Sequence, residues 1–189
     1  MQSRFSWRLV DVVTASVIGV TAGVVFWLWG LGWSALSTPI DALLAGAGAF
    51  FAGVWLFAGV LGGLIIRKPG AALLSELIAA VVSALIGSQW GVTALWSGFV
   101  QGLGAELVFA LFVYRFFNAY VAVLAGATAG LAMAINDLLV SYPGADSLFV
   151  SVYLVAAILG GAVIAGLGSW ALARGLAASG ALRRFASGQ

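Results

Sequence analysis

Several residue types are absent or rare in this sequence, and each absence excludes a class of function. There is no cysteine and no histidine among the 189 residues. Disulfides, thiol nucleophiles, imidazole bases and the usual zinc, copper or nickel ligands are therefore excluded. No Walker A motif is present, so this chain does not hydrolyse nucleotides itself. We expect a protein that is not an enzyme and that uses no metal and no cofactor.

Charged residues are also scarce, and this determines the class of fold. Only 7% of the residues are charged, against roughly 25% in soluble domains. Hydrophobic residues make up 63%, and the mean hydropathy is +1.16. The 26 glycines are spread through apolar segments, which favours close contact between membrane helices. The composition predicts an all-α integral membrane protein forming a single transmembrane domain over residues 1–189. The net charge of +2 comes from loop residues and does not indicate nucleic-acid binding.

Apolar runs long enough to cross a bilayer, which takes about 20 residues, recur along the chain. The breaks between them contain Pro, Gly, Asn or charge, which end helices. One break is expected from Gly30 to Pro39, and another from Ser88 to Gly91. Six transmembrane helices are predicted at about 9–31, 41–66, 71–87, 92–114, 119–140 and 148–173.

The basic residues give the predicted orientation in the membrane. In a six-span arrangement all eight lie on one side: Arg4, Arg8, Arg67, Lys68, Arg115, Arg174, Arg183 and Arg184. The positive-inside rule places both termini in the cytoplasm. We therefore expect a multi-pass protein of the cell membrane, the plasma membrane of a bacterium. Trp33 and Trp90 fall at the expected interface depth, typical of an aromatic belt.

Two glutamates, Glu76 and Glu106, interrupt apolar runs. A charge at such depth costs at least about 2.5–3.5 kcal/mol, so its presence needs a compensating interaction. Gln101 lies about 14 Å inside its predicted span and Glu106 about 21 Å, at 1.5 Å per residue. Antiparallel pairing of the spans that carry them predicts that Glu76, Gln101 and Glu106 face one interior. A ligand cavity is one interpretation. The other is that each glutamate pairs with a loop cation or joins two helices by hydrogen bonds.

The candidate binding residues nearer the outer surface are Trp96, Asp137 and Tyr142. Trp96 could stack on an aromatic ligand or pack against a neighbouring helix. Asp137 could face an outward-opening site or cap the end of its helix. All three are included among the predicted ligand-binding residues because of their depth and position.

Two segments carry a resemblance to a known family. The strings RKPGAALLSE (67–76) and VQGLGAELVF (100–109), in a six-span context, resemble the YkoE family. Members of this family are substrate-binding S components of energy-coupling factor (ECF) transporters for thiamine or its hydroxymethylpyrimidine precursor. The resemblance covers most of spans 3 to 5. It implies the S-component fold and the partners of such a subunit: a transmembrane scaffold and ATPase subunits. It also implies Glu76, Gln101 and Glu106 as ligand-binding residues.

The first span carries small residues at every fourth position, Ala15, Gly19 and Gly23. Such spacing allows another helix to approach closely. The resemblance implies that this face contacts the scaffold subunit. The predicted function is a substrate-binding subunit of an ATP-driven vitamin importer, which captures thiamine or hydroxymethylpyrimidine from outside. The alternative is a structural or assembly membrane protein whose glutamates only pair helices.

Overall fold

The fold, known from a computed structural model, is described for residues 5–183 and 185. This part of the chain is helical and contains no strand. The elements in order are α1 (Leu9–Leu43), η1 (Ala47–Leu56), α2 (Phe57–Ile66), α3 (Ala71–Leu85), α4 (Thr93–Leu111), α5 (Ala119–Val140), α6 (Ser147–Gly160), η2 (Gly161–Leu167) and α7 (Gly168–Ala178). The segment η1 is a 3₁₀-helix that continues into α2, and η2 is a π-helical segment between α6 and α7.

Five helical segments of the described chain are long and apolar enough to cross a membrane: Leu9–Leu43, Ala47–Ile66, Thr93–Leu111, Ala119–Val140 and Ser147–Ala178. The sixth expected span corresponds to α3, a shorter apolar helix. At 1.5 Å per residue its 15 residues extend about 22 Å, less than the roughly 30 Å of a bilayer core. That α3 crosses the membrane as a sixth span stays a prediction.

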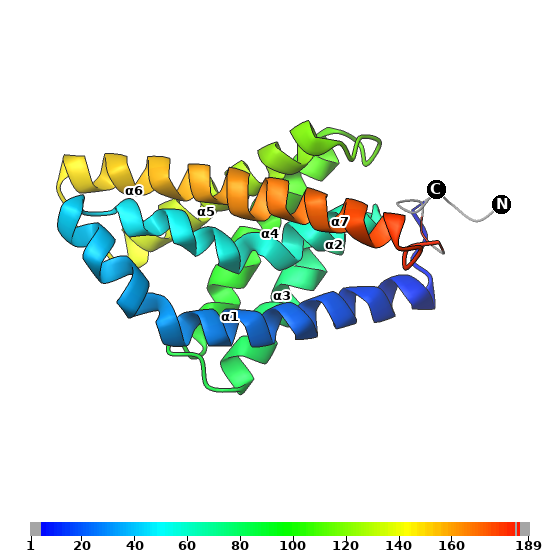
Figure 1. The fold of residues 1–189 in the computed structure, drawn as a ribbon, viewed down its shortest axis with the longest axis horizontal. Helices are drawn as coiled ribbons and strands as arrows, with labels where there is room; N and C mark the ends of the chain where they lie inside the picture. The colour runs from blue at the N-terminus through cyan, green and yellow to red at the C-terminus, as the bar shows by residue number, and fades with distance from the viewer. Residues whose placement is uncertain (1–4, 184, 186–189) are drawn as a thin grey trace.

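The predicted break from Gly30 to Pro39 is wrong. Helix α1 continues through both residues and ends at Leu43, and Pro39 lies inside it. The course of α1 changes direction along its second half, as Figure 1 shows. The side chain of Gln89 donates to the Gly30 carbonyl oxygen (3.2 Å), and Trp33 contacts the ring of Trp55 (4.8 Å between centroids). These tertiary contacts hold the C-terminal part of α1 in place despite residues that disfavour helix.

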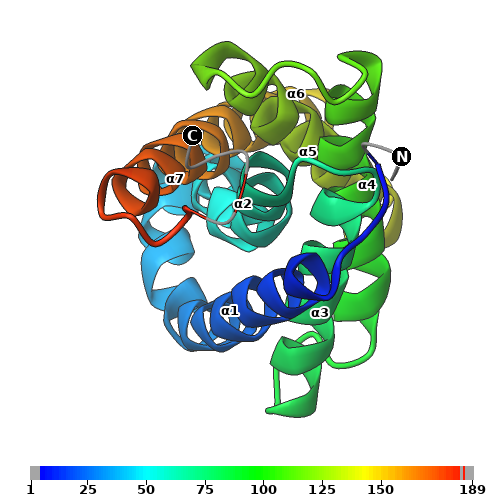
Figure 2. The same cartoon turned by 90° about the vertical axis from the view of Figure 1, so that its right-hand side faces the viewer.

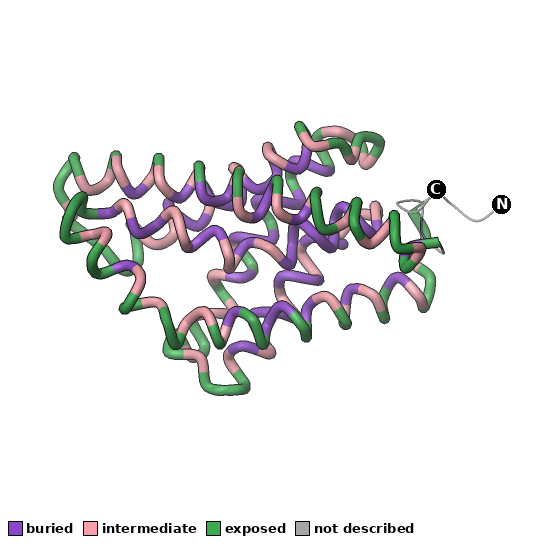
Figure 3. Tube along the Cα trace, in the orientation of Figure 1, coloured by how far each residue is buried: buried purple, intermediate pink, exposed green. Residues whose placement is uncertain are grey.

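The continuous segment η1–α2 is the central helix of the bundle. Figure 2 shows it surrounded by the other helices, and every residue of α2 from Ala58 to Ile66 is buried. The trace in Figure 3 is accordingly buried along the middle of the molecule and exposed at its periphery. Glycines make these contacts close: a Cβ on Gly62 or Gly63 would collide with the side chains of Ser75 or Phe109.

The small-residue face of α1 is used inside the chain. Ala15 has no exposed surface, a Cβ on Gly19 would lie 2.6 Å from Ile78 of α3, and one on Gly23 would lie 2.7 Å from the Ala79 carbonyl. The prediction of close helix contact is therefore confirmed. The prediction that these three residues contact another subunit is contradicted, because α3 occupies this face.

The described basic residues lie before α1, between α2 and α3, between α4 and α5, and in or after α7. Figure 1 shows these segments toward the end of the molecule where both termini lie. Lys68 bonds to the buried Asp11, which also pairs with Arg8 (3.0 Å). Arg67 lies over the ring of Phe117, 4.9 Å from its centroid. Of the predicted basic residues, Arg4 and Arg184 lie outside the described residues.

Candidate functional site

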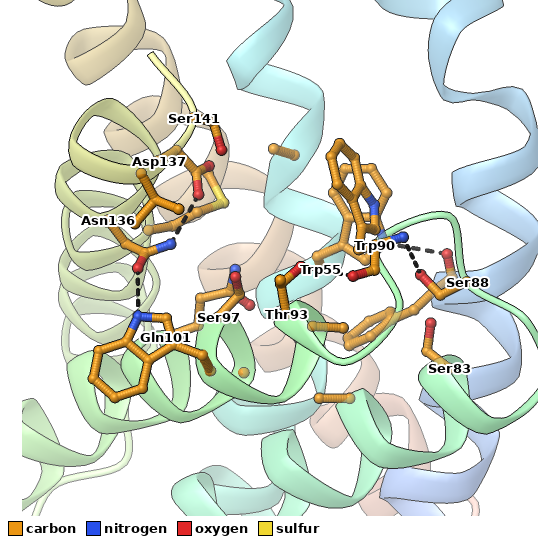
Figure 4. A pocket seen from close by; sticks show the side chains of 18 of the residues that line it. Trp55, Ser83, Ser88, Trp90, Thr93, Ser97, Gln101, Asn136, Asp137 and Ser141 are labelled. Carbon is orange, nitrogen blue, oxygen red and sulfur yellow. Dashed lines mark hydrogen bonds between the residues drawn. The ribbon is translucent and has the colours of Figure 1, made fainter. Parts of the chain in front are cut away.

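A cavity of about 440 Å³ lies among α1, η1, α3, α4, α5 and α6. It reaches the turn that joins α3 to α4 and the C-terminal end of α5, so it occupies the end of the bundle away from the termini. Figure 4 shows the side chains that enclose it. Small-molecule pockets span about 300–1,000 Å³, so this cavity has the size of a ligand site.

The cavity has a buried floor and an exposed rim. Glu76, Phe26 and Ser83 are buried at the floor. Trp90 and Trp96 are about half exposed at the rim, with 45% and 58% of their surface accessible. Because the rim is exposed and the floor is buried, a ligand can enter from one side and bury one end next to a carboxylate.

The walls of the cavity are strongly aromatic. Four indole side chains line it: Trp33, Trp55, Trp90 and Trp96. The ring of Trp55 contacts Trp33 on one side and meets Trp90 edge-on at 6.2 Å on the other. The Trp55 indole N–H donates to the Phe26 carbonyl oxygen at 3.1 Å, which fixes the ring at mid-span. Aromatic faces of this kind attract flat heterocycles and cations.

Glu76 supplies the unsatisfied polar atom of the floor. Its Oε2 accepts from the backbone N–H of Gly59 at 2.6 Å, and Gly59 is the third residue of α2, just after the 3₁₀-helix η1 passes into the α-helix. Its Oε1 has no hydrogen-bond partner, although the residue is buried. Because an unpaired buried acceptor is costly, this oxygen is placed to accept from a ligand.

Glu106 lies at the N-terminus of α3 and does not line the cavity. Its Oε1 accepts from the Gly70 N–H (2.7 Å) and the Tyr114 hydroxyl (2.7 Å), and its Oε2 from the N–H groups of Ala72 (2.9 Å) and Leu73 (3.3 Å). Burial and the neighbouring carboxylate raise the pKa of the Tyr114 hydroxyl, which lies in the loop after α4 and therefore stays a donor. A negative charge is favourable at a helix N-terminus, so Glu106 caps α3.

The shared cavity predicted for the two glutamates is therefore wrong. On α4, a Cβ on Gly98 would lie 2.5 Å from Ala80, and one on Gly102 would lie 2.9 Å from the Cβ of Glu76. These two glycines thus bring α4 close against α3. The interhelical hydrogen bonding that was the alternative interpretation applies to Glu106.

A second carboxylate lines the cavity near its rim. Asp137 accepts from the Asn136 amide at 3.1 Å and from the Tyr153 hydroxyl at 2.9 Å. The Trp96 indole N–H donates to the Asn136 side-chain oxygen at 2.8 Å, so a chain of hydrogen bonds joins α4, α5 and α6 (Figure 4). The ring of Tyr142 contacts that of Tyr153 at 5.4 Å.

Five of the six predicted ligand-binding residues line one cavity: Glu76, Trp96, Gln101, Asp137 and Tyr142. Whether they touch a ligand stays a prediction. Trp55 and Tyr153 were not predicted as lining residues, and Trp33 and Trp90 were expected in an aromatic belt although both line the cavity. A mid-span indole or phenol needs a hydrogen-bond partner inside the membrane, and that requirement was the signal available for Trp55 and Tyr153.

Two carboxylates, neutral polar groups and an aromatic wall form a site suited to a flat molecule that carries hydrogen-bond donors and positive charge. A bundle of apolar helices around such a cavity defines a substrate-binding membrane protein. Comparisons with known proteins agree with this class. Residues 10–132 match the family described as "ABC-type cobalt transport system, permease component".

Two individual proteins show the family more closely. The putative HMP/thiamine permease protein YkoE of Bacillus subtilis (strain 168) is 36% identical over 190 residues, covering 97% of this chain and 92% of that protein. A crystal structure of an S-component of an ECF transporter matches with a TM-score of 0.90 and 36% identity, covering 97% of this chain and 92% of that one. The chain belongs to the YkoE family of ECF-transporter S components. It is a multi-pass cell-membrane subunit that binds substrate and is not an enzyme.

Proposed function

We propose that this chain captures thiamine or its hydroxymethylpyrimidine precursor at the outer face of the membrane for an ATP-driven importer. The observation that carries the proposal is the unpartnered Oε1 of Glu76 at the floor of an aromatic cavity. An aminopyrimidine offers an amine N–H to this oxygen, and such a charge-assisted hydrogen bond is stronger than a neutral one. The name of the Bacillus subtilis relative, an HMP/thiamine permease, supports the same ligands.

The remaining cavity residues suit the rest of such a ligand. Gln101 presents an amide near the floor, where ring nitrogens need a donor. Trp96, Tyr142 and Asp137 lie at the rim, where a thiazolium cation would meet aromatic faces and a negative charge. Glu106 is left out of this proposed site because its two oxygens already accept four hydrogen bonds.

The description of the matching family names cobalt, and the composition of this chain favours an organic cation instead. There is no histidine and no cysteine in the sequence. Within the described residues, no group of three or more acidic side chains could hold a metal ion. Carboxylates with an aromatic wall suit a flat heterocyclic cation better than a transition metal.

We further propose that α3 is the sixth crossing and that both termini are cytoplasmic. The segments that carry the described basic residues, such as the start of α1 and the end of α7, lie toward the end of the bundle that carries the termini (Figure 1), and the cavity lies at the other end. The positive-inside rule then makes the cavity open outward. The captured ligand would be passed on with an ECF scaffold and its ATPases, as the S-component family implies.

The test is ligand binding to the purified full-length chain in detergent. Because four tryptophans line the cavity, thiamine and hydroxymethylpyrimidine should each change the intrinsic fluorescence in a saturable way. Glu76→Gln should weaken thiamine binding at least about tenfold, about 1.4 kcal/mol. Biotin serves as a control of similar size that carries a carboxylate. If neither proposed ligand binds and Glu76→Gln only changes stability, the chain is a structural membrane protein and the proposal fails.

A further inference from the structure

Several hydrogen-bond donors of the cavity wall are engaged within the protein. The indole N–H groups of Trp55 and Trp96 donate to a backbone carbonyl and to Asn136. The Asn136 amide and the Tyr153 hydroxyl both donate to Asp137. The groups left to face a ligand include the unpartnered acceptor Oε1 of Glu76.

The charge of the lining has one sign. Glu76 and Asp137 are acidic, and none of the described residues that line the cavity is Lys or Arg. Lys68 and Arg8 are bound to Asp11 at the start of α1, outside the cavity lining. The donors still available around the cavity are neutral, such as the Gln101 amide and the hydroxyls of Ser83, Ser97 and Ser141.

A phosphate group needs the opposite surroundings. Protein sites for phosphate use Arg, Lys or rows of free backbone N–H groups, which are cationic or strongly donating. The backbone N–H of Gly59, next to Glu76, already donates to that carboxylate. A phosphate entering the cavity would lose water and meet carboxylates without a compensating cation.

We propose that the cavity selects its ligand by charge: it takes the unphosphorylated cation and rejects the phosphate esters of the same molecule. This inference rests on the proposed function, and it adds a specificity that size alone does not supply. Asp137 and Glu76 are its specificity-determining residues, acting by repulsion of the anion as well as by attraction of the cation.

The first test uses the unmodified chain. Its dissociation constants for thiamine and thiamine monophosphate are measured at pH 7.5 by tryptophan fluorescence. The monophosphate should bind at least tenfold more weakly. At pH 5 the ratio of the two constants should shrink at least threefold, because the second ionisation of a phosphate monoester has a pKa of about 6. Because thiamine and its monophosphate share the thiamine moiety, the ratio of their dissociation constants cancels pH effects on the binding of that moiety.

The second test uses matched variants. Asp137→Asn removes a cavity charge and should shrink the same ratio at least threefold at pH 7.5. Asp146→Asn removes an equal charge at the N-cap of α6, outside the cavity lining, and should leave the ratio unchanged. If Asp137→Asn fails to fold, as judged by its melting temperature, Glu76→Gln replaces it, and the pH comparison on the native chain still stands.

The outcomes separate this inference from the proposed function. The inference is supported if the monophosphate binds more weakly than thiamine and if the ratio of the two constants shrinks at pH 5. The ratio must also shrink in Asp137→Asn and stay unchanged in Asp146→Asn. Equal binding of both ligands, or a ratio that shrinks equally in Asp146→Asn, overturns the charge selection and leaves the vitamin-binding function intact. Binding of neither ligand overturns both.

Discussion

Glu76 and Glu106 lie on adjacent helices, and they differ in the number of hydrogen bonds that their carboxylates accept. Both are buried, with 1% and 8% of their surface exposed, and both accept N–H groups from the first turn of a helix. Glu106 accepts four hydrogen bonds through its two oxygens, whereas Glu76 accepts one and leaves Oε1 unpartnered. The burial of a charge therefore does not by itself identify a ligand site in a membrane protein. A buried acceptor that has no hydrogen-bond partner in the protein is the better indicator of a ligand site.

The two residues also show that a carboxylate accepting backbone N–H groups of a neighbouring helix can serve either stability or binding. In each case a carboxylate from one helix accepts a backbone N–H of the helix before it: Glu106 of α4 accepts at the N-terminus of α3, and Glu76 of α3 accepts from Gly59 of α2. A full set of donors makes Glu106 a structural cap. At Glu76 the donor set is incomplete on the side of the cavity, so the ligand is expected to complete it.

The largest effect is expected from Glu106→Ala. Removing this acceptor leaves three N–H groups of α3 and the Tyr114 hydroxyl without a partner, which should lower the free energy of unfolding by about 3 kcal/mol. Thermal unfolding in detergent measures this loss. Glu106→Gln keeps an acceptor and should lose only about half as much. Unchanged melting of the alanine variant would show that Glu106 is not a structural cap.

Thiamine should stabilise the native chain by mass action. At a hundred times its dissociation constant, a ligand that binds only the folded state adds about 2.7 kcal/mol. Glu76→Gln should need at least tenfold more thiamine for the same rise in melting temperature. Tyr120→Phe, at an exposed ring outside the cavity, is the control and should match the native chain. Equal stabilisation of Glu76→Gln would mean that Oε1 does not meet the ligand.

A smaller effect is expected from Tyr114→Phe. The hydroxyl donates to Glu106 at 2.7 Å, and a hydrogen bond to a charged group contributes about 1.5 kcal/mol. The variant should lose this much stability and keep its affinity for thiamine, because Tyr114 lies outside the cavity lining. Denaturant unfolding and fluorescence titration separate the two quantities. A loss of affinity without a loss of stability would reverse the roles given to the two glutamates.

The smallest effect concerns Gly59. A Cβ there would lie 3.1 Å from Oε2 of Glu76 and 3.3 Å from the Ala72 carbonyl, so Gly59→Ala should displace the carboxylate. We expect thiamine affinity to fall by about 1 kcal/mol, roughly fivefold. Gly175→Ala, where an added Cβ meets nothing within 4 Å, should leave affinity unchanged. If both substitutions act alike, Gly59 has no role in placing Glu76.

The sequence allowed correct prediction of the membrane class and the family, because hydropathy and the strings at 67–76 and 100–109 are local signals. The first helix was predicted to end too early. Gly30 and Pro39 disfavour helix by roughly 1 and 3 kcal/mol. Tertiary contacts such as that of Trp33 with Trp55 overcame this local preference.

At the candidate site, depth and helix face were enough to bring Glu76 and Gln101 into one cavity with the rim residues. They were not enough to place Glu106, because its partners are N–H groups 33 to 36 positions away in the chain. The face formed by Ala15, Gly19 and Gly23 was correctly predicted to make close contact, but spacing cannot tell whether the neighbouring helix belongs to the same chain.

The most direct test measures two quantities for the same two variants: the dissociation constant for thiamine and the free energy of unfolding of Glu76→Gln and Glu106→Gln. The structure predicts a crossed result. Glu76→Gln should lose at least tenfold in affinity and keep its stability, whereas Glu106→Gln should lose about 1–2 kcal/mol of stability and stay within threefold of the native affinity. An affinity loss in Glu106→Gln as large as that in Glu76→Gln, with both variants equally stable, would contradict the account.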